Sequence, residues 1–354
     1  MPVYKKRKVA AVVAASALLL SGCGMFGGKE ASKQIDPPQD ISYVKDGQTE
    51  EAESSAEKNE DAASVMREIF LIDENGLVVS QQVTMPKTDG VAKQTLQYLV
   101  EGGPVSNILP DGFRAVLPPD TEIKGVTIKD GTAVADFSKE FGNYQPDDEM
   151  RILQAVTWTL TQFDNVQKVK IWVNGHELKE MPVNGTPITD ELSRSDGINF
   201  DTKNTVNMTN TYPLTVYFLA ENNDGSYYVP VTKRIPNDIK DSYAAAVLAL
   251  IEGPDRGSGL LSEFQAGLKL NSKPLYKNGE VVLDFNEAIF GAFEEEKKVI
   301  SQHVLNSLVL SLTEQKGVES VSVQVNGKAE LVKEDGQKLT EPVSRPEDVN
   351  TGSF

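Results

Sequence analysis

The sequence predicts an α+β fold of two tandem copies of a β-β-α-β-β-α-β unit, with helices packed on one face of a mixed, mostly antiparallel sheet. The first observation is a duplication: strands at 132–137 and 170–175 return at 280–285 and 322–327, each pair separated by a helical pattern. A period this long marks a repeated domain and not a solenoid repeat. The second observation is that strand residues alternate between apolar and polar, as in a sheet with one covered face.

Each copy is predicted to begin with a β-hairpin and a helix. The hairpin turns fall at 74–76 and 222–225, where Asn-Gly and Asp-Gly supply the positive φ angles of a tight turn. Apolar residues spaced by four and then three predict the buried face of each helix. These residues are Ala92, Leu96 and Leu99 in the first copy, and Ala244, Leu248 and Ile251 in the second.

The segment after this helix is where the copies differ most. Both helices end at a Gly-Pro stop, and the first copy then continues through a proline-rich loop at 105–121 that contains Phe113. Loops of this length usually bind a ligand or pack as a structured loop. We therefore expect the two copies to present different surfaces here.

The second half of each copy contains a hairpin, a long helix and a final strand. The final strands end in Asn174-Gly175 and Asn326-Gly327. The second copy has four extra residues between hairpin and helix, and this stretch includes Glu294, whose carboxylate the helix dipole favours. The elements lie at 126–137, 153–163 and 169–173 in the first copy, and at 274–285, 305–312 and 321–325 in the second.

A motif at the end of each copy sets the domain boundaries. Arg194 lies four residues before Ile198, and Arg345 lies four residues before Val349. The spacer before the first copy is acidic and poor in large apolar residues, which predicts an extended, disordered segment. The predicted organisation is a signal peptide at 1–22, the spacer at 23–66, domains at 67–199 and 213–350, and a linker at 200–212.

The N-terminus resembles a bacterial lipoprotein signal peptide. Four basic residues precede an apolar run, Val9 to Leu20, that is too short to span a bilayer, and a Leu-Ser-Gly-Cys lipobox follows. The resemblance implies cleavage between Gly22 and Cys23 and a diacylglyceryl thioether on Cys23, whose two acyl chains would anchor the chain stably. An uncleaved transmembrane helix is the alternative. We expect the folded part on the extracytoplasmic face of the cell membrane.

The composition argues against several classes of partner and site. The net charge is −17 and becomes −21 without the four basic residues of the leader, which argues against nucleic acid as a partner. Any contact with the membrane is therefore expected to come from the lipid anchor. One cysteine and two histidines cannot assemble a zinc site, and no cofactor is indicated. The composition makes no prediction of the oligomeric state.

Several stretches of the first copy together resemble the GerMN domain. They are Leu99-Val100-Glu101-Gly102-Gly103-Pro104, the 117–121 loop, Asp130-Gly131-Thr132-Ala133-Val134-Ala135-Asp136-Phe137-Ser138, Thr159-Leu160-Thr161 and Val173-Asn174-Gly175. Two such domains behind a lipobox resemble spore germination lipoproteins, although the second copy departs in the loop after Pro254. The resemblance implies a role in the mother cell–forespore envelope complex and in cortex peptidoglycan metabolism. It also implies similarity to ring-building motifs, and hence an interaction module.

No residue is predicted to be catalytic. Neither His176 nor His303 has a histidine at the matching position of the other copy, so we expect surface or hydrogen-bonded side chains. Asp136 and Asp284 recur at a strand end, but glycan cleavage needs a pair of carboxylates and each copy supplies one. An aspartate at such a place is more often a turn or helix cap.

Two arginines and one tryptophan remain as candidates for contacts. Arg194 and Arg345 are predicted to clasp the end of each domain through carboxylates or carbonyls, with a peptidoglycan carboxylate as the alternative partner. Trp172 has Gln324 as its counterpart and faces the opposite side of its strand from its neighbours, which makes it the best candidate for a contact by one copy only. Phe113 and Glu294 are further candidates because they lie where the copies diverge.

The leading hypothesis is a membrane-anchored, non-enzymatic tandem module that recognises envelope proteins or peptidoglycan during sporulation and germination. The alternatives are a peptidoglycan hydrolase and a solute-binding lipoprotein, which would need two lobes around a cleft. What recurs between the copies is glycine, proline, asparagine and apolar periodicity. Function is therefore expected where the copies differ.

Overall fold

The computed structural model describes residues 64–201, 208–290, 298–329, 331–346 and 350. Both repeats belong to one compact unit. Gly22, Cys23 and Glu294 lie outside the described residues. Within the described part, no helix is both long enough and apolar enough to cross a membrane.

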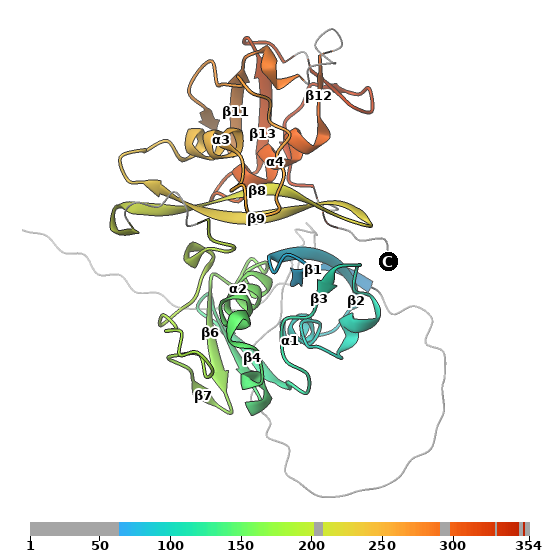
Figure 1. Cartoon of the computed structure of the whole chain (residues 1–354), viewed down its shortest axis with the longest axis vertical. Coiled ribbons are helices and arrows are strands. Elements are labelled where there is room, and N and C mark those ends of the chain that lie inside the picture. Colours follow the sequence, from blue (N-terminus) through green and yellow to red (C-terminus); the bar gives the residue numbers. More distant parts are fainter. Residues whose placement is uncertain (1–63, 202–207, 291–297, 330, 347–349, 351–354) are drawn as a thin grey trace, which may run out of the picture. The chain divides into compact units, whose positions relative to one another are not determined.

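The first repeat follows the predicted order of elements (Figure 1). Strands β1 and β2 pair antiparallel, and the short β3 adds to the other side of β1. A second sheet has the order β4-β5-β6-β7, in which only β5 and β6 run parallel. The bounds are β1 Ser64–Asp73, β2 Val78–Pro86, α1 Val91–Gln97, β3 Phe113–Arg114, β4 Ile123–Lys129, β5 Thr132–Phe137, α2 Glu149–Leu160, β6 Lys168–Val173 and β7 His176–Glu177.

The second repeat has the same plan. Its hairpin is β8-β9 and its sheet has the order β10-β11-β13-β16, again with one parallel pair, and the strands β12, β14 and β15 form a further small sheet. The bounds are β8 Thr211–Asn222, β9 Gly225–Pro236, α3 Ser242–Glu252, β10 Leu275–Lys277, β11 Glu280–Phe285, β12 Val299–Ile300, α4 Gln302–Thr313, β13 Ser320–Val325, β14 Leu331–Lys333, β15 Lys338–Leu339 and β16 Val343–Ser344.

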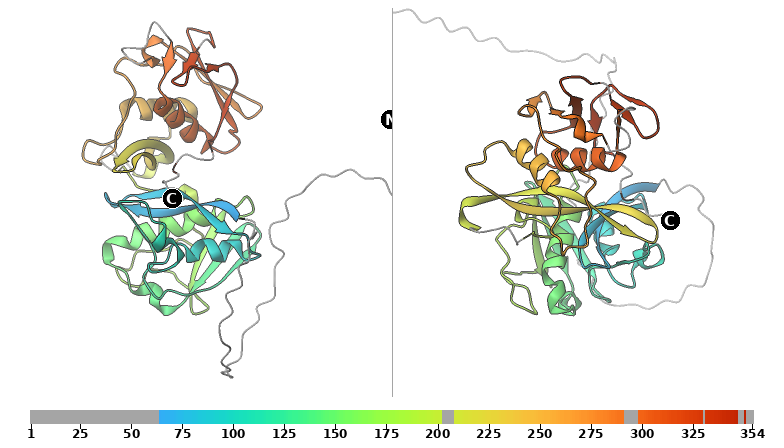
Figure 2. Two further views of the ribbon diagram at one scale, coloured as in Figure 1. Left: turned by 90° about the vertical axis from the view of Figure 1, so that its right-hand side faces the viewer. Right: turned by 45° about the horizontal axis from the view of Figure 1, so that its top comes forward.

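The predicted α+β class with mostly antiparallel strands is confirmed, and in each repeat the first hairpin is separate from the four-stranded sheet. In the second repeat, α3 and α4 lie between the β8-β9 hairpin and the sheet that contains β11 and β13 (Figures 1 and 2). The same hydrogen bond ties helix to hairpin in both repeats. The Phe70 amide donates to Thr159 Oγ1 at 3.0 Å, and the Tyr217 amide donates to Ser311 Oγ at 2.9 Å.

Strand alternation predicts correctly which face of the second sheet is buried. In β5, Ala133, Ala135 and Phe137 are fully buried, whereas Val134 and Asp136 point away from the core. Trp158 of α2 fills the core of the first repeat and meets the Phe70 ring edge-on, with centroids 5.5 Å apart. The apolar stripe of each strand therefore holds the helices on one side of this sheet and leaves the other side free.

The predicted buried face of the first helix is right in one copy and wrong in the other. Ala92, Leu96 and Leu99 are buried as predicted, but Leu248 of α3 is 50% exposed. The predicted residues of the two helices are 152 positions apart, whereas matching Glu101-Gly102 to Glu252-Gly253 gives an offset of 151, which pairs Leu96 and Leu99 with the buried Val247 and Leu250. The buried residues of α3 are Ala245, Ala246, Val247, Ala249 and Leu250.

Both domains also begin slightly earlier than predicted. The strand β1 starts at Ser64, where it pairs with Pro86, and β8 starts at Thr211, where it pairs with Pro236. The predicted starts at 67 and 213 therefore fall inside strands, because the ladder continues beyond the apolar residues that signalled each hairpin.

An asparagine at the end of the first repeat joins it to the second. The Asn199 side chain accepts from the Val78 amide at 2.8 Å and donates to the Val78 carbonyl at 2.7 Å and the Pro230 carbonyl at 2.9 Å. Val78 belongs to β2 and Pro230 to β9, so one side chain satisfies backbone groups of both hairpins.

Asn350 of the second repeat makes the matching contact, bonding to its own hairpin strand β9 and to β2 of the first repeat. The Asn350 side chain accepts from the Tyr228 amide at 2.8 Å and donates to the Tyr228 carbonyl at 2.8 Å and the Ser80 carbonyl at 3.0 Å. Tyr228 lies in β9 and Ser80 in β2. The two asparagines thus form a joint of approximate two-fold symmetry, the form expected when a duplicated domain packs against its own copy.

Glu149 at the start of α2 holds a loop of the first repeat. Its buried carboxylate accepts from the amides of Asn184 at 2.7 Å and Thr186 at 3.1 Å and from the Tyr144 hydroxyl at 2.8 Å. Burial alone would raise the pKa of this carboxyl, but these donors outweigh burial and lower the pKa to about 2.

Acid should therefore weaken the first repeat by protonating Glu149. Because the folded pKa lies below the ordinary 4.5, this stabilisation is complete above that pH and is lost as the pH falls toward about 2. The substitution Glu149→Gln should lower the free energy of unfolding at pH 7 by about 2 kcal/mol, since the loop amides lose a charged acceptor. Urea unfolding at pH 7 and pH 3 measures both effects. If the variant lost as much stability on acidification as the wild type, another group would be responsible.

Candidate functional site

The strand β4 forms one end of its sheet and presents a free backbone edge. Lys129 and Thr132 flank the two-residue turn at Asp130-Gly131, whose φ angles are 50° and 79°. In such a hairpin the flanking pair is hydrogen-bonded, and hydrogen-bonded pairs then alternate with non-hydrogen-bonded ones. The amide and carbonyl of Val126 and Ile128 therefore point away from β5.

The outer face of this sheet is lined by residues from three strands. Asp136 of β5 lies opposite Gly125 of β4 on one side and Trp172 of β6 on the other. A β-bulge between Ile123 and Gly125 inserts Lys124 into the edge and bends it. Because position 125 is glycine, open space remains above β4 next to Asp136.

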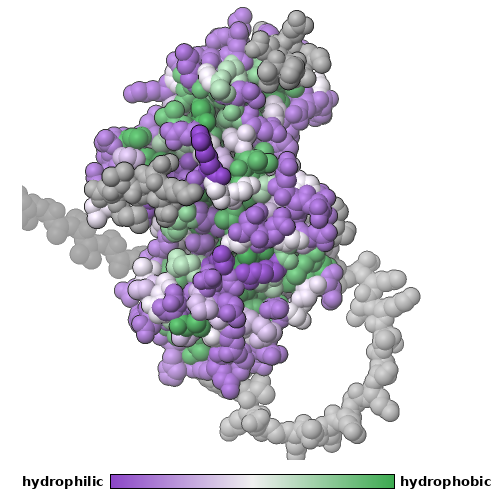
Figure 3. All heavy atoms as spheres, viewed as in Figure 1, coloured by the Kyte–Doolittle hydropathy of each residue, from purple (hydrophilic) through white to green (hydrophobic). Residues whose placement is uncertain are grey.

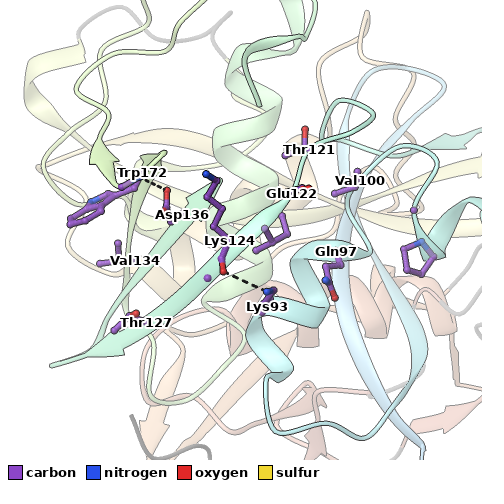
Figure 4. A pocket seen from close by; sticks show the side chains of 15 residues that line it. Lys93, Gln97, Val100, Thr121, Glu122, Lys124, Thr127, Val134, Asp136 and Trp172 are labelled. Atoms are coloured by element: carbon purple, nitrogen blue, oxygen red, sulfur yellow. Dashed lines mark hydrogen bonds between the residues drawn. The ribbon is translucent and has the colours of Figure 1, made fainter. Parts of the chain in front are cut away.

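A groove of about 1200 Å³ runs across this face and over the β4 edge toward α1 (Figure 4). Lys93 and Gln97 of α1 form its far wall, and Val100, Gly103 and Pro104 close one end. Lys93 Nζ reaches across to donate to the Lys124 carbonyl at 3.5 Å. The groove therefore brings together a free strand edge, an aromatic side chain and charged side chains of both signs, with Glu122 and Asp136 beside the two lysines.

Two buried polar atoms that line this groove have no hydrogen-bond partner among the described residues. They are Thr121 Oγ1 and Trp172 Nε1, and Thr121 is only 6% exposed. A buried hydroxyl or indole N–H without a partner costs about 1–3 kcal/mol. Both atoms are enclosed by protein, so a ligand in the groove would first contact the exposed side chains that line it.

Two regions that sequence comparison singled out meet in this groove. Thr121 ends the divergent 105–121 loop, and Trp172 is the aromatic residue that only the first copy carries at this position. Phe113 of the same loop lies elsewhere, half-buried against the Tyr227 ring at 5.2 Å between centroids. The third region, around Glu294, lies outside the described residues.

The repeated aspartates hold the turns of neighbouring strands. Asp136 Oδ1 accepts from the Gly175 amide at 3.0 Å, and Asp284 Oδ1 accepts from the Gly327 amide at 2.8 Å. Each Gly follows an asparagine with positive φ, at Asn174 and Asn326. The repeated Asp and Asn-Gly residues thus form one structural unit per copy, and the turn-cap interpretation fits them better than a helix cap.

The repeated arginines converge on a single carboxylate. Arg194 Nη1 donates to Glu314 at 2.7 Å, Arg345 Nη1 lies 3.4 Å from the same carboxylate, and Tyr217 donates to it at 2.8 Å. The Arg194 guanidinium also lies 4.4 Å from the Trp158 ring centroid. Burial alone would raise the pKa of Glu314, but the two guanidinium groups hold it below its usual value.

The two histidines have different surroundings. His176 is exposed on β7, and His303 Nδ1 lies 3.0 Å from the Tyr228 hydroxyl. Within the described residues, no group of three or more His, Cys, Asp or Glu side chains is placed to hold a metal ion.

Hydrophilic residues dominate the face seen in Figure 3, with apolar residues in small separate patches.

Sequence reasoning missed several residues of the groove and the joint. Lys93 and Lys124 line the groove from a helix and a bulge, which apolar periodicity does not reveal. One available signal was the contrast between Val126 and its counterpart Pro274, because proline removes a backbone donor from a strand edge. The asparagine joint had a signal too, since Asn199 and Asn350 end the repeated motif.

Comparison with known proteins agrees with this architecture. The family model "Germane: Sporulation and spore germination" matches residues 68–179 and 215–331, one match in each repeat. The chain is 58% identical over 358 residues to Spore germination protein GerM of Bacillus subtilis (strain 168), covering 98% of each chain.

Two solved structures are similar to this chain. The tandem GerMN domains of the sporulation protein GerM from Bacillus subtilis are 61% identical with a TM-score of 0.78, covering 82% of this chain and 100% of that one. The first GerMN domain of that protein is 65% identical with a TM-score of 0.37, covering 37% of this chain and 99% of that one. The chain thus belongs to the Germane family of sporulation and spore germination, with one family domain in each of its two repeats.

Proposed function

We propose that this chain is a membrane-anchored, non-enzymatic interaction module of sporulation and spore germination that binds a protein of the cell envelope through the groove of its first repeat. The observation that carries the proposal is the groove itself, which combines the free β4 edge with the Trp172 side chain and the lysines Lys93 and Lys124. The relative's printed name supports the biological setting. The lipobox supports anchoring at Cys23, on the extracytoplasmic face.

A binding role suits the carboxylates better than hydrolysis does. Asp136 and Asp284 each use one carboxylate oxygen to accept a hydrogen bond from a turn amide of their own repeat. Each repeat has one such aspartate. Glycoside hydrolysis calls for two carboxyl groups flanking the scissile bond. Their positions are therefore explained by turn geometry, without a catalytic role.

A glycan ligand is the second candidate, because Trp172 offers an aromatic ring on the groove. Sugar rings and extended peptides both use aromatic contacts and hydrogen-bond donors. The free backbone edge favours a protein, since a peptide pairs with a strand edge through regular main-chain hydrogen bonds.

The test is crosslinking in sporulating cells, with the variant Trp172→Gln, which imports the residue of the second repeat. We expect the wild-type chain to be crosslinked to an envelope protein, and the variant to lose most of that product, while Gln324→Ala in the second repeat keeps it. Sedimentation with purified peptidoglycan runs in parallel. The proposal is wrong if no envelope protein is crosslinked and the wild-type chain sediments with peptidoglycan in a manner that depends on Trp172.

A further inference from the structure

We propose that the free edge of β4 is a strand-addition site, at which an extended acidic segment of a partner protein pairs as a fifth strand of the β4-β5-β6-β7 sheet. This inference rests on the proposed interaction role and names the kind of segment that the groove takes. The opening observation is the position of β4 at the end of the strand order.

The backbone of the edge is in the right state for pairing. From Gly125 to Lys129 the register with β5 is regular, so the outward amides and carbonyls of Val126 and Ile128 follow the spacing of a sheet ladder. The bulge is confined to the step between Ile123 and Gly125. An added strand would therefore find five regular residues, 125–129, beside it.

The groove provides space for the side chains of such a strand. Side chains of an added strand alternate between the two faces of the sheet. Those on the inner face would meet Val126 and Ile128, which pack against the core while remaining partly exposed, and are expected to be apolar. Those on the outer face would enter the groove, which Thr127, Val134 and Trp172 line.

Three lysines along the edge favour carboxylates on an added strand, and these carboxylates are expected next to the lysines and away from Glu122 and Asp136, which also line the groove. Lys124 and Lys129 lie at the two ends of the regular stretch and are exposed, and Lys93 faces the edge from α1. Lysines on an edge strand normally discourage pairing with other chains. A second copy pairing antiparallel through the same edge would bring Lys124 of one copy near Lys129 of the other, whereas carboxylates on an incoming strand would pair with both.

The second repeat shows the same edge in a closed form. Pro274 occupies the position that matches Val126, so one outward donor is missing there. Tyr276 of β10 stacks on Tyr243 of α3, with ring centroids 5.8 Å apart, and its hydroxyl donates to the Gly317 carbonyl at 3.0 Å. The duplication thus provides an internal comparison in which only the first repeat keeps both edge donors.

The experiment uses the full chain in mild detergent and a fluorescein-labelled octapeptide of alternating valine and glutamate, capped at both ends. Fluorescence anisotropy should show saturable binding that weakens as salt rises, because the lysine contacts are screened. Hydrogen exchange should slow at the amides of Val126 and Ile128 and remain unchanged at Tyr276. A peptide of alternating valine and lysine should bind at least about tenfold more weakly, since like charges oppose pairing.

The variant Val126→Pro imports the residue of the second repeat and removes one outward amide. We expect its affinity for the peptide to fall by about tenfold or more, whereas Val126→Thr, which keeps the amide, should stay within about threefold of the wild type. Circular dichroism checks that both variants fold. If Val126→Pro does not fold, the double variant Lys124→Glu and Lys129→Glu replaces it, with the same loss expected for the glutamate peptide.

Three results would overturn the inference. The first is binding of the glutamate peptide without protection of the Val126 and Ile128 amides. The second is equal binding by Val126→Pro and the wild type. The third is binding only after residues 24–63 are removed, which would make the chain's own acidic spacer the occupant. If Trp172→Gln lost the envelope crosslink and Val126→Pro kept it, the strand-addition hypothesis would be wrong and the proposed interaction role would still stand.

Discussion

Replacing Glu314 by glutamine is expected to lower the free energy of unfolding by about 3–5 kcal/mol, the range found when one member of a buried ion pair is removed. Its side chain is 11% exposed and receives Arg194 from the first repeat and Arg345 from the second. Without the carboxylate, two partly buried guanidinium groups would keep only the more distant charge of Glu68 to oppose their repulsion. Urea unfolding followed by circular dichroism measures the loss.

The control for this prediction is Glu319→Gln, at an exposed position of the same repeat. Its effect should stay within about 0.5 kcal/mol. The Arg194–Glu314 contact links residues of both repeats. If the Glu314 variant proved as stable as the Glu319 variant, the arginines would have found other partners and the carboxylate would not be central to the joint.

Replacing Trp158 by alanine is expected to cost about 3–5 kcal/mol, the usual range for a large aromatic side chain removed from a core. Trp158 is 1% exposed, packs edge-on against Phe70 and supports the Arg194 guanidinium on its ring face. The cavity left by the indole would therefore loosen both the core of the first repeat and the nearby ion cluster. Thermal and urea unfolding both report this loss.

The variant Trp158→Phe separates ring packing from hydrogen bonding. Trp158 Nε1 has no partner among the described residues, so phenylalanine gives up ring volume without giving up a hydrogen bond. The expected cost is less than about 1.5 kcal/mol, as for other conservative core exchanges. A cost equal to that of Trp158→Ala would mean that the indole N–H has a partner in solution.

Features set by local physics were predictable from the sequence. Asn174-Gly175 and Asn326-Gly327 do adopt positive φ angles, because few other residues adopt that conformation easily. The alternation of β5 correctly placed Phe137 inside and Asp136 outside, because successive strand residues point to opposite faces of the sheet.

Features that depend on distant segments were not predictable. Asn199 reaches Val78, which is 121 residues away, and no local pattern identifies that partner. The counterpart of Glu314 in the first repeat is Gln162, so Glu314 is not a repeated residue. Comparing the copies therefore did not identify it as the residue that both arginines contact. The predicted face of α3 is wrong because its residues lie 152 positions after their counterparts in the first copy, one more than the 151 that separate the Glu-Gly stops of the two helices.

The candidate groove lies between these two cases. Trp172 was identifiable because it interrupts the repeat, and the 105–121 loop because it diverges. That Thr121 of this loop would lie in one groove with Trp172 and the β4 edge depends on tertiary packing. Divergence between copies therefore located the region, and the structure supplied the edge, the lysines and the partnerless hydroxyl.

The most direct test of a binding role for the first repeat places a photo-crosslinking amino acid at position 127 or at position 275 of the full chain in sporulating cells. Thr127 and Leu275 are matched outer-face positions of the two edge strands, and both are exposed. We predict a discrete product with an envelope protein from position 127, lost in the Trp172→Gln background, and none from position 275. Equal products from both positions, or a product from position 275 alone, would contradict a binding role confined to the groove of the first repeat.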